Sequence, residues 1–225
     1  ETGGSERLRI DSNGKLLGGN YFTSKQIGAV TAPVQIQGTT ADTSALSLFR
    51  YSNDTGGSTI TLGKGRGTSG GAIDKPQEND TVGTIHFHIA NNNDLVNGNV
   101  AAIDVQVDAE PGGSDTPGRI RFLTSPDGSS TLTERLRINS SGKILIGDDT
   151  AESTMGLSAN VQTFGTDASS SSIAIRRGSN DAQAAFLVMS KSRNTSVGSR
   201  TILQNGDEVG NIFFVADDGT DLASN

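Results

Sequence analysis

The chain has 225 residues, of which 32% are hydrophobic and 4% aromatic, and it contains 29 glycines but no tryptophan or cysteine. So few aromatic side chains argue against the ring-lined pocket of a typical small-molecule enzyme, and the lack of cysteine excludes disulfides and thiolate metal sites. The net charge of −7 argues against nucleic-acid and anionic-membrane partners, which are held by clustered lysine and arginine. No apolar run approaches the roughly 20 residues that cross a bilayer, so no membrane insertion is expected.

Charged and apolar residues alternate with period two in residues 119–122 and 135–138, and other short segments rich in apolar residues are bounded by turn residues, so all of these are predicted strands. In chain order these are residues 45–51, 58–62, 84–90, 100–107, 119–122, 135–138, 143–147, 172–176, 185–190, 201–204 and 211–216. The segments between 119 and 147 are separated by turn-forming residues and should form a meander. No run of ten residues has a capped helical stripe, so helix content should be small. The sequence therefore predicts an all-β chain of short antiparallel strands and polar turns.

A long internal repeat divides the chain. The segment Glu6-Arg7-Leu8-Arg9-Ile10 recurs 128 positions later as Glu134-Arg135-Leu136-Arg137-Ile138. From Ser52 onward the offset is 127, whereas residues 20–44 and 148–171 follow the pattern poorly. We expect the end of a preceding unit at residues 1–5, a complete β-rich unit at 6–133 and a second, incomplete unit at 134–225. Such units, repeated in a longer array, are a means of building length.

The low apolar content also predicts association. Folding must offset about 1–2 kcal/mol of backbone entropy per residue, and a unit with so few large apolar side chains would bury little core on its own. The missing burial can come from copies of the same chain that pair their strand edges around a common axis.

Two segments carry a resemblance to a known family. Residues 133–147, TERLRINSSGKILIG, resemble a recurrent element of tail-fibre proteins of tailed bacteriophages, those of marine phages especially. Residues 107–122, VDAEPGGSDTPGRIRF, are similar to the stretch that precedes it there. The resemblance implies an elongated homotrimeric fibre of the virion, exposed in the extracellular phase. It also implies contact with other virion tail proteins, and with the host-cell surface through a tip that these residues do not contain.

His86 and His88 are the candidate metal ligands of the sequence. Residues i and i+2 of a strand share a face, so three chains around an axis could present six imidazole nitrogens to a transition metal. Some phage tail fibres use an H-x-H pair in this way, so the resemblance favours this use. Phe213 and Val215 stand at the equivalent positions of the second unit, which favours an inward, packed location instead. We therefore assign no metal and no cofactor.

Other motifs are weaker. Residues 65–70, GRGTSG, match a dinucleotide-binding pattern, but the second copy lacks every glycine and no helix pattern follows either copy. Acidic residues occur in loops and could bind calcium or act as a glycosidase pair, although solvated turn positions explain them more simply; they are Asp108, Glu110, Asp148, Asp149, Asp217, Asp218 and Asp221. The arginines of the two repeated segments should pair with carboxylates across strands.

The predicted function is structural: a shaft segment of a phage tail fibre that spaces and presents a receptor-binding tip, with no enzymatic activity and no catalytic residues. One alternative is a receptor- or glycan-binding module that uses loops such as residues 91–99. Another is a bacterial surface filament or adhesin, and a third is a polysaccharide-degrading spike.

Overall fold

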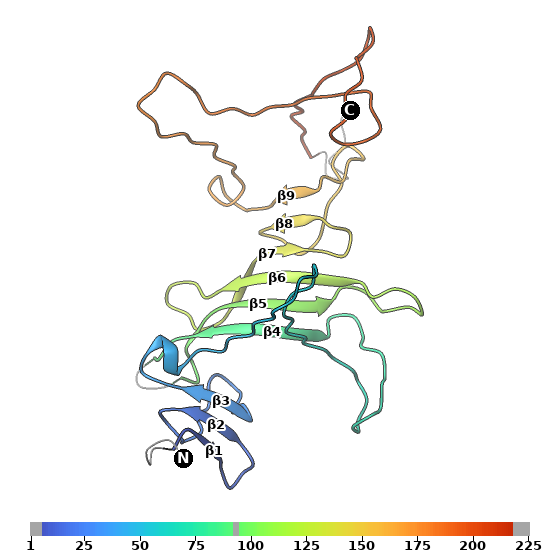
Figure 1. Ribbon diagram of the computed structural model, residues 1–225. Coiled ribbons are helices and arrows are strands. Elements are labelled where there is room, and N and C mark those ends of the chain that lie inside the picture. The colour runs from blue at the N-terminus through green and yellow to red at the C-terminus, as the bar shows by residue number, and fades with distance from the viewer. Residues whose placement is uncertain (1–5, 92–94, 218–225) are drawn as a thin grey trace. The chain divides into compact units, whose positions relative to one another are not determined.

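The computed structural model describes residues 6–91 and 95–217, and these form an all-β chain (Figure 1). Within these ranges the helical content is one 3-10 turn, η1 (Ala41–Thr43), in agreement with the low helix content expected from the sequence. No helix in the described part of the chain is long and apolar enough to cross a bilayer. The chain divides into two compact units between Ile144 and Leu145. Below, the first and second unit are these two bodies, whose boundary lies eleven residues after the start of the second sequence repeat at residue 134.

A three-stranded sheet opens the first unit, with β1 (Leu8–Ile10), β2 (Leu16–Gly19) and β3 (Val34–Gln37) in that order. β1 and β2 are antiparallel, but β2 and β3 are parallel. The prediction of antiparallel strands is therefore wrong for this pair. The physical reason is the crossover of residues 20–33, which returns the chain to the start of the sheet and has the length that parallel pairing requires.

Four longer strands follow in the first unit, each antiparallel to the next. They are β4 (Thr81–His88), β5 (Asn99–Val107), β6 (Gly118–Thr124) and β7 (Thr133–Ile138). The alternation of the sequence predicts all four to within a few residues. β4 lies at the edge of the sheet, and its register with β5 shifts between Phe87 and His88. The candidate histidines thus lie at an irregular end of an edge strand.

The second unit begins within β8 (Ile144–Ile146) and contains β9 (Val161–Thr163). The N–H of Phe164 donates to the Ile146 carbonyl at 2.8 Å, which ties the end of β9 to β8. Gly147 ends β8 with φ of 90°, and a Cβ there would lie 2.1 Å from the Phe164 carbonyl oxygen. Only glycine fits this close approach.

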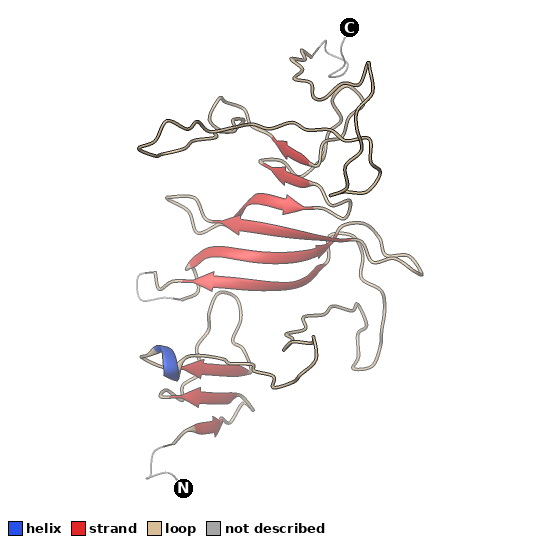
Figure 2. Ribbon diagram, turned by 45° about the horizontal axis from the view of Figure 1, so that its top comes forward, coloured by secondary structure: helices blue, strands red, loops and turns tan. Residues whose placement is uncertain are grey.

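Six predicted strands are not formed in the single chain, and they are drawn as loops in Figure 2: 45–51, 58–62, 172–176, 185–190, 201–204 and 211–216. In the described part of the chain, 45–51, 58–62, 172–176 and 185–190 form no backbone hydrogen bond. A strand requires a neighbour that completes its ladder, and no described segment is paired with these.

The interior of each unit is small. Leu17 of β2 and Leu145 of β8, 128 positions apart, are the large side chains of the described residues that are fully buried. Buried charges are paired: Arg119 lies 3.2 Å from Asp108, and Arg121 bonds Asp104. In contrast, most isoleucine, leucine and phenylalanine side chains of the segments without ladder partners are exposed.

Hydrogen-bonded motifs occur twice, at positions 127 apart. The Gln35 side chain bridges the backbone of Lys25 at 2.9 and 3.0 Å, and that of Gln162 bridges Glu152 at 2.9 and 3.1 Å. An isolated bridge joins Ile27 to Val30, and another joins Thr154 to Leu157. These contacts lie within 20–44 and 148–171, so local geometry recurs in stretches where the two sequences match poorly, although Gln35 and Gln162 are the same residue.

Candidate functional site

His86 and His88 line a recess of about 380 Å³ in the first unit. Their ring centroids are 5.6 Å apart and the rings are tilted by 41°, as expected for neighbours on one face of β4. The other walls are the turn at residues 27–30 and the side chains of Val96, Asn97 and Asn99. The structure therefore brings the two predicted residues together.

Gly28 makes room for the imidazole of His88. A Cβ at this position would lie 2.8 Å from Cε1 of His88, and Gly28 has φ of 59°, a conformation that side-chain-bearing residues rarely adopt. Its N–H donates to the carbonyl of Leu95 at 2.9 Å, which holds the turn against the recess. Nδ1 of His88 is buried and has no hydrogen-bond partner among the described residues. Such an unsatisfied nitrogen is a feature that needs an explanation.

Metal binding by His86 and His88 would require ligands from other copies. In residues 6–91 and 95–217, no group of three or more metal-ligating side chains is placed to hold an ion. One chain thus offers two imidazoles at this recess, fewer than the three or four protein ligands of common transition-metal sites. The metal hypothesis stays a prediction.

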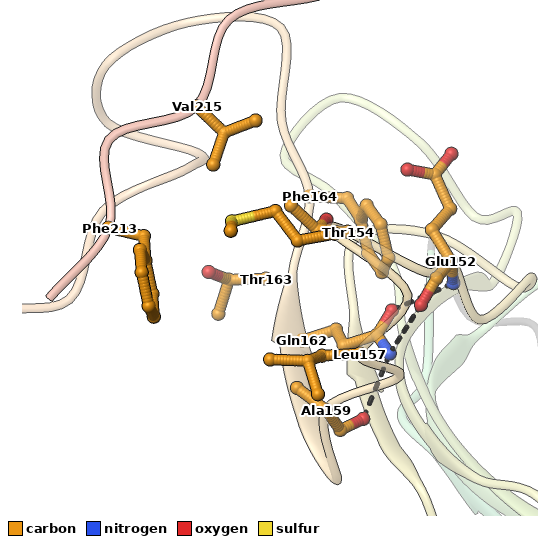
Figure 3. A pocket seen from close by; sticks show the side chains of 10 residues that line it. Glu152, Thr154, Leu157, Ala159, Gln162, Thr163, Phe164, Phe213 and Val215 are labelled. Atoms are coloured by element: carbon orange, nitrogen blue, oxygen red, sulfur yellow. Dashed lines mark hydrogen bonds between the residues drawn. The ribbon is translucent and has the colours of Figure 1, made fainter. Parts of the chain in front are cut away.

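The second unit has a recess at the equivalent place, and Figure 3 shows its lining. Its volume is about 430 Å³, and it is bounded by Met155, Leu157, Phe164, Phe213 and Val215. Phe213 and Val215 stand 127 positions after His86 and His88, and Met155 stands 127 positions after Gly28. The histidine recess is therefore replaced by an apolar one.

Met155 is the residue of this recess that sequence reasoning missed. It has φ of 55°, like Gly28, although it carries a side chain. An offset of 127 applied to Gly28 would have found it, but the turn lies in the poorly matched stretch. In the first unit glycine faces the large imidazole of His88, whereas in the second methionine faces the smaller Val215. The glycine opposite a histidine in the first unit is thus matched by a methionine opposite a valine in the second.

A polar recess of about 430 Å³ lies at the loop proposed for glycan contact. Its lining includes Asn91, Asn97 and Asn99, together with Ser129 and Ser130 of the loop between β6 and β7. Residues 92–94 of this loop lie outside the described part of the chain. Amide and hydroxyl groups of this kind can hydrogen-bond sugar hydroxyls, since they offer both donors and acceptors.

Two arginines of the repeated segments bond carboxylates of their own segment, so the prediction of pairing across strands is wrong for these two bonds. Arg9 bonds Glu6, and Arg137 lies 2.5 Å from Glu134. Arg135 donates instead to Thr124 Oγ1 across the strand pair, at 3.0 Å. Arg121 makes cross-strand ion pairs, with Asp104 on β5 and Glu134 on β7.

The glycine-rich loop is held by an ion pair rather than preceding a helix. Arg66 donates to Asp80 at 2.6 and 2.8 Å, and Arg193 makes the same two bonds to Asp207 in the second unit. The Arg66 bond is the main reason that the pKa of Asp80 lies well below its usual range, and Arg193 acts likewise on Asp207. The glycines at 65 and 67 therefore belong to a loop that recurs without them.

The loop carboxylates are engaged by individual partners. Glu110 lies 2.7 Å from Lys75, and Asp108 accepts a 2.8 Å hydrogen bond from the Ser140 N–H. Partial burial raises the pKa of Asp108, but the bonds from Ser140 and Arg119 outweigh it, so that the pKa is lowered. Asp148 accepts bonds from the N–H groups of Asp149 and Thr150. Asp218 and Asp221 lie outside the described residues.

The chain is similar in fold to a solved phage structure. No protein-family model matches the sequence, and a search of curated proteins gives no significant match. The carboxy-terminal domain of the L-shaped tail fibre of bacteriophage T5 matches with a TM-score of 0.58 and 15% identity, covering 80% of this chain and 73% of that one. The same domain with its intra-molecular chaperone domain gives a TM-score of 0.37 and 21% identity, over 48% and 26% of the two chains. The first comparison shows a shared fold.

Proposed function

We propose that this chain is a structural segment of a bacteriophage tail fibre, which associates with copies of itself and spaces a receptor-binding tip from the virion. The observation that carries the proposal is the fold shared with the T5 tail-fibre domain over 80% of the chain. The partners would be two further copies and other virion tail proteins, and the place of action would be the extracellular phase.

The surface of the chain supports association. It exposes 17315 Å², whereas a folded monomer of 23.2 kDa exposes about 9,700 Å². The excess of about 7,600 Å² exceeds the 2,000–5,000 Å² buried in most obligate interfaces. Segments that could bury this surface are present, since the predicted strands without ladder partners carry exposed apolar residues.

Light scattering tests the proposal directly. A homotrimer should scatter with three times the 23.2 kDa mass of one chain at micromolar concentration. A mass of one chain at every concentration would contradict the proposal. The same preparation should leave the viscosity of host-capsule polysaccharide unchanged, because a structural segment needs no catalytic groups.

A glycan-binding module is the second candidate, and the polar recess at Asn91, Asn97 and Asn99 favours it. This candidate predicts that labelled chain binds host cells. Asn99→Ala should abolish the binding, whereas the control Asn53→Ala, in an exposed turn, should leave it unchanged. A shaft segment without receptor contacts should leave the cells unlabelled.

A further inference from the structure

Exposed apolar residues occupy equivalent positions in the two units. In the first unit they are Leu46, Leu48, Ile60 and Leu62, and their counterparts 127 positions later are Ile173, Ile175, Leu187 and Met189. Their exposed fractions are similar in pairs, as in 70% for Leu46 and 74% for Ile173, or 69% for both Ile60 and Leu187. We call each set of four an association face. In a lone chain these eight side chains would remain in contact with water.

The opposite side of the same segment does not keep its apolar character. Phe49 and Tyr51 pack against one another with ring centroids 4.6 Å apart, but Arg176 and Gly178 stand at their equivalent positions. In an extended segment Leu46 and Leu48 point to one side and Phe49 to the other. On the side of Leu46 and Leu48 the first two residues are apolar in both units, before Arg50 or Arg177 follows on the same side, so the requirement for burial belongs to those two positions.

The association faces are attached to the body of each unit. A Cβ on Gly83 of β4 would lie 2.6 Å from Cβ of Leu62, and a Cβ on Gly210 would lie 2.8 Å from Cβ of Met189. The segments are therefore held at one end by close packing on a glycine of β4 or its counterpart. Their backbone donors and acceptors nevertheless have no backbone partner in the described chain.

Charge in the first segment suits a partner of identical sequence. Copies that meet in register place like residues near one another, and like charges in such pairs are destabilising. Residues 45–62 contain two charged side chains, Arg50 and Asp54. Arg50 follows Leu46 and Leu48 on the same side, but its charge is neutralised by its bond to Asp54. In the second unit Arg177 and Asp181 form the same pair, and the additional Arg176 lies on the side opposite the association face.

We infer that the two association faces are strand-pairing surfaces for other copies of this chain, and that residues 45–51, 58–62, 172–176 and 185–190 become strands only in the assembly. The inference rests on the proposed self-association and adds to it the segments that carry it. It explains why period-two segments with no ladder partner retain apolar residues at the same positions in both units.

Matched lysine variants on opposite sides of one segment test the inference. Leu46 is 70% exposed and Phe49 is 73% exposed, so a lone chain would tolerate lysine equally at both positions. We expect Leu46→Lys to reduce the mass from that of the oligomer to 23.2 kDa at a concentration where the unaltered chain is associated. Phe49→Lys should keep the oligomer mass. Equal effects of the two variants on an associated chain would overturn the inference.

Hydrogen exchange of the unaltered chain gives a second readout if Leu46→Lys fails to fold. Amides of residues 46–50 and 173–176 should exchange at least tenfold more slowly than those of the loop at 68–73, where Ile73 is 92% exposed. Slow exchange in the oligomer supports the inference. An oligomer with fast exchange in both segments would overturn it and leave the proposed function intact, whereas a chain that never associates would contradict the proposed function itself.

Discussion

At the scale of single residues, the loop carboxylates accept hydrogen bonds that hold the turns, and these bonds depend on pH because they require the ionised carboxylate. Asp181 accepts hydrogen bonds from Arg177, from Ser179 Oγ at 2.7 Å and from the Gln183 N–H at 2.8 Å. These bonds, that from Arg177 first, lower the pKa of Asp181 from 3.8 to about 2. Because the folded pKa lies below the unfolded one, the stability contributed by these hydrogen bonds is fully present above about pH 4 and is lost as the pH falls through about 2. A titration of the carboxyl carbon by NMR measures this midpoint. Arg177→Gln should move it up toward 3.8, and an unchanged midpoint in that variant would contradict the assignment.

Because the two recesses occupy equivalent positions, the lining residues of the second unit should be tolerated in the first only when they are introduced together. Gly28→Met should destabilise the first unit, because its side chain would overlap His88 and because methionine is disfavoured at this φ; we expect about 2–3 kcal/mol. The triple variant with His86→Phe and His88→Val copies the lining of the second unit, so it should recover the part of the loss due to overlap. Urea unfolding at one fixed protein concentration measures both. A triple variant no more stable than Gly28→Met would show that the two recesses are not equivalent.

At the scale of elements, a leucine at the same position of two short strands forms the core. Leu17→Ala and Leu145→Ala should each cost about 2–5 kcal/mol, since both side chains are fully buried and the strands around them are too short to close the cavity. Leu8→Ala, at a position 63% exposed, is the control and should change the free energy of unfolding by less than about 1 kcal/mol. Equal losses at Leu8 and Leu17 would contradict the small-core description.

Some of the strands can be predicted from the sequence and others cannot. β4 to β7 are predictable because each contains an alternating stretch and is bounded by turn residues, as in residues 119–122 of the Gly118–Thr124 strand. The parallel pairing of β3 is not, because it depends on the course of residues 20–33, which no local pattern records. Segments such as 58–62 are predicted as strands because alternation shows which side is to be buried, but it does not show whether a strand partner is present in the chain. The sequence identifies His86 and His88 because their spacing is a local pattern. Gly28 lies far from them in the sequence, so only the folded structure shows that it faces His88.

At the scale of the whole molecule, the proposed association predicts a stability that depends on concentration. If association buries the excess of about 7,600 Å², the folded state is an oligomer, and mass action stabilises it as the concentration of chains rises. With an unfolding enthalpy of about 0.7 kcal/mol per residue, a trimer of this length should gain about 4 °C in its unfolding midpoint for a hundredfold increase in concentration.

Differential scanning calorimetry under conditions of reversible unfolding measures this shift. The Phe49→Lys chain, altered on the side away from the association face, should show the same concentration dependence as the unaltered chain. The Leu46→Lys chain should unfold at a lower temperature that no longer depends on concentration, because a lone chain has no association equilibrium to displace. A midpoint of the unaltered chain that stays constant over the hundredfold range would contradict association, since burial between copies is the one contribution to stability that dilution removes.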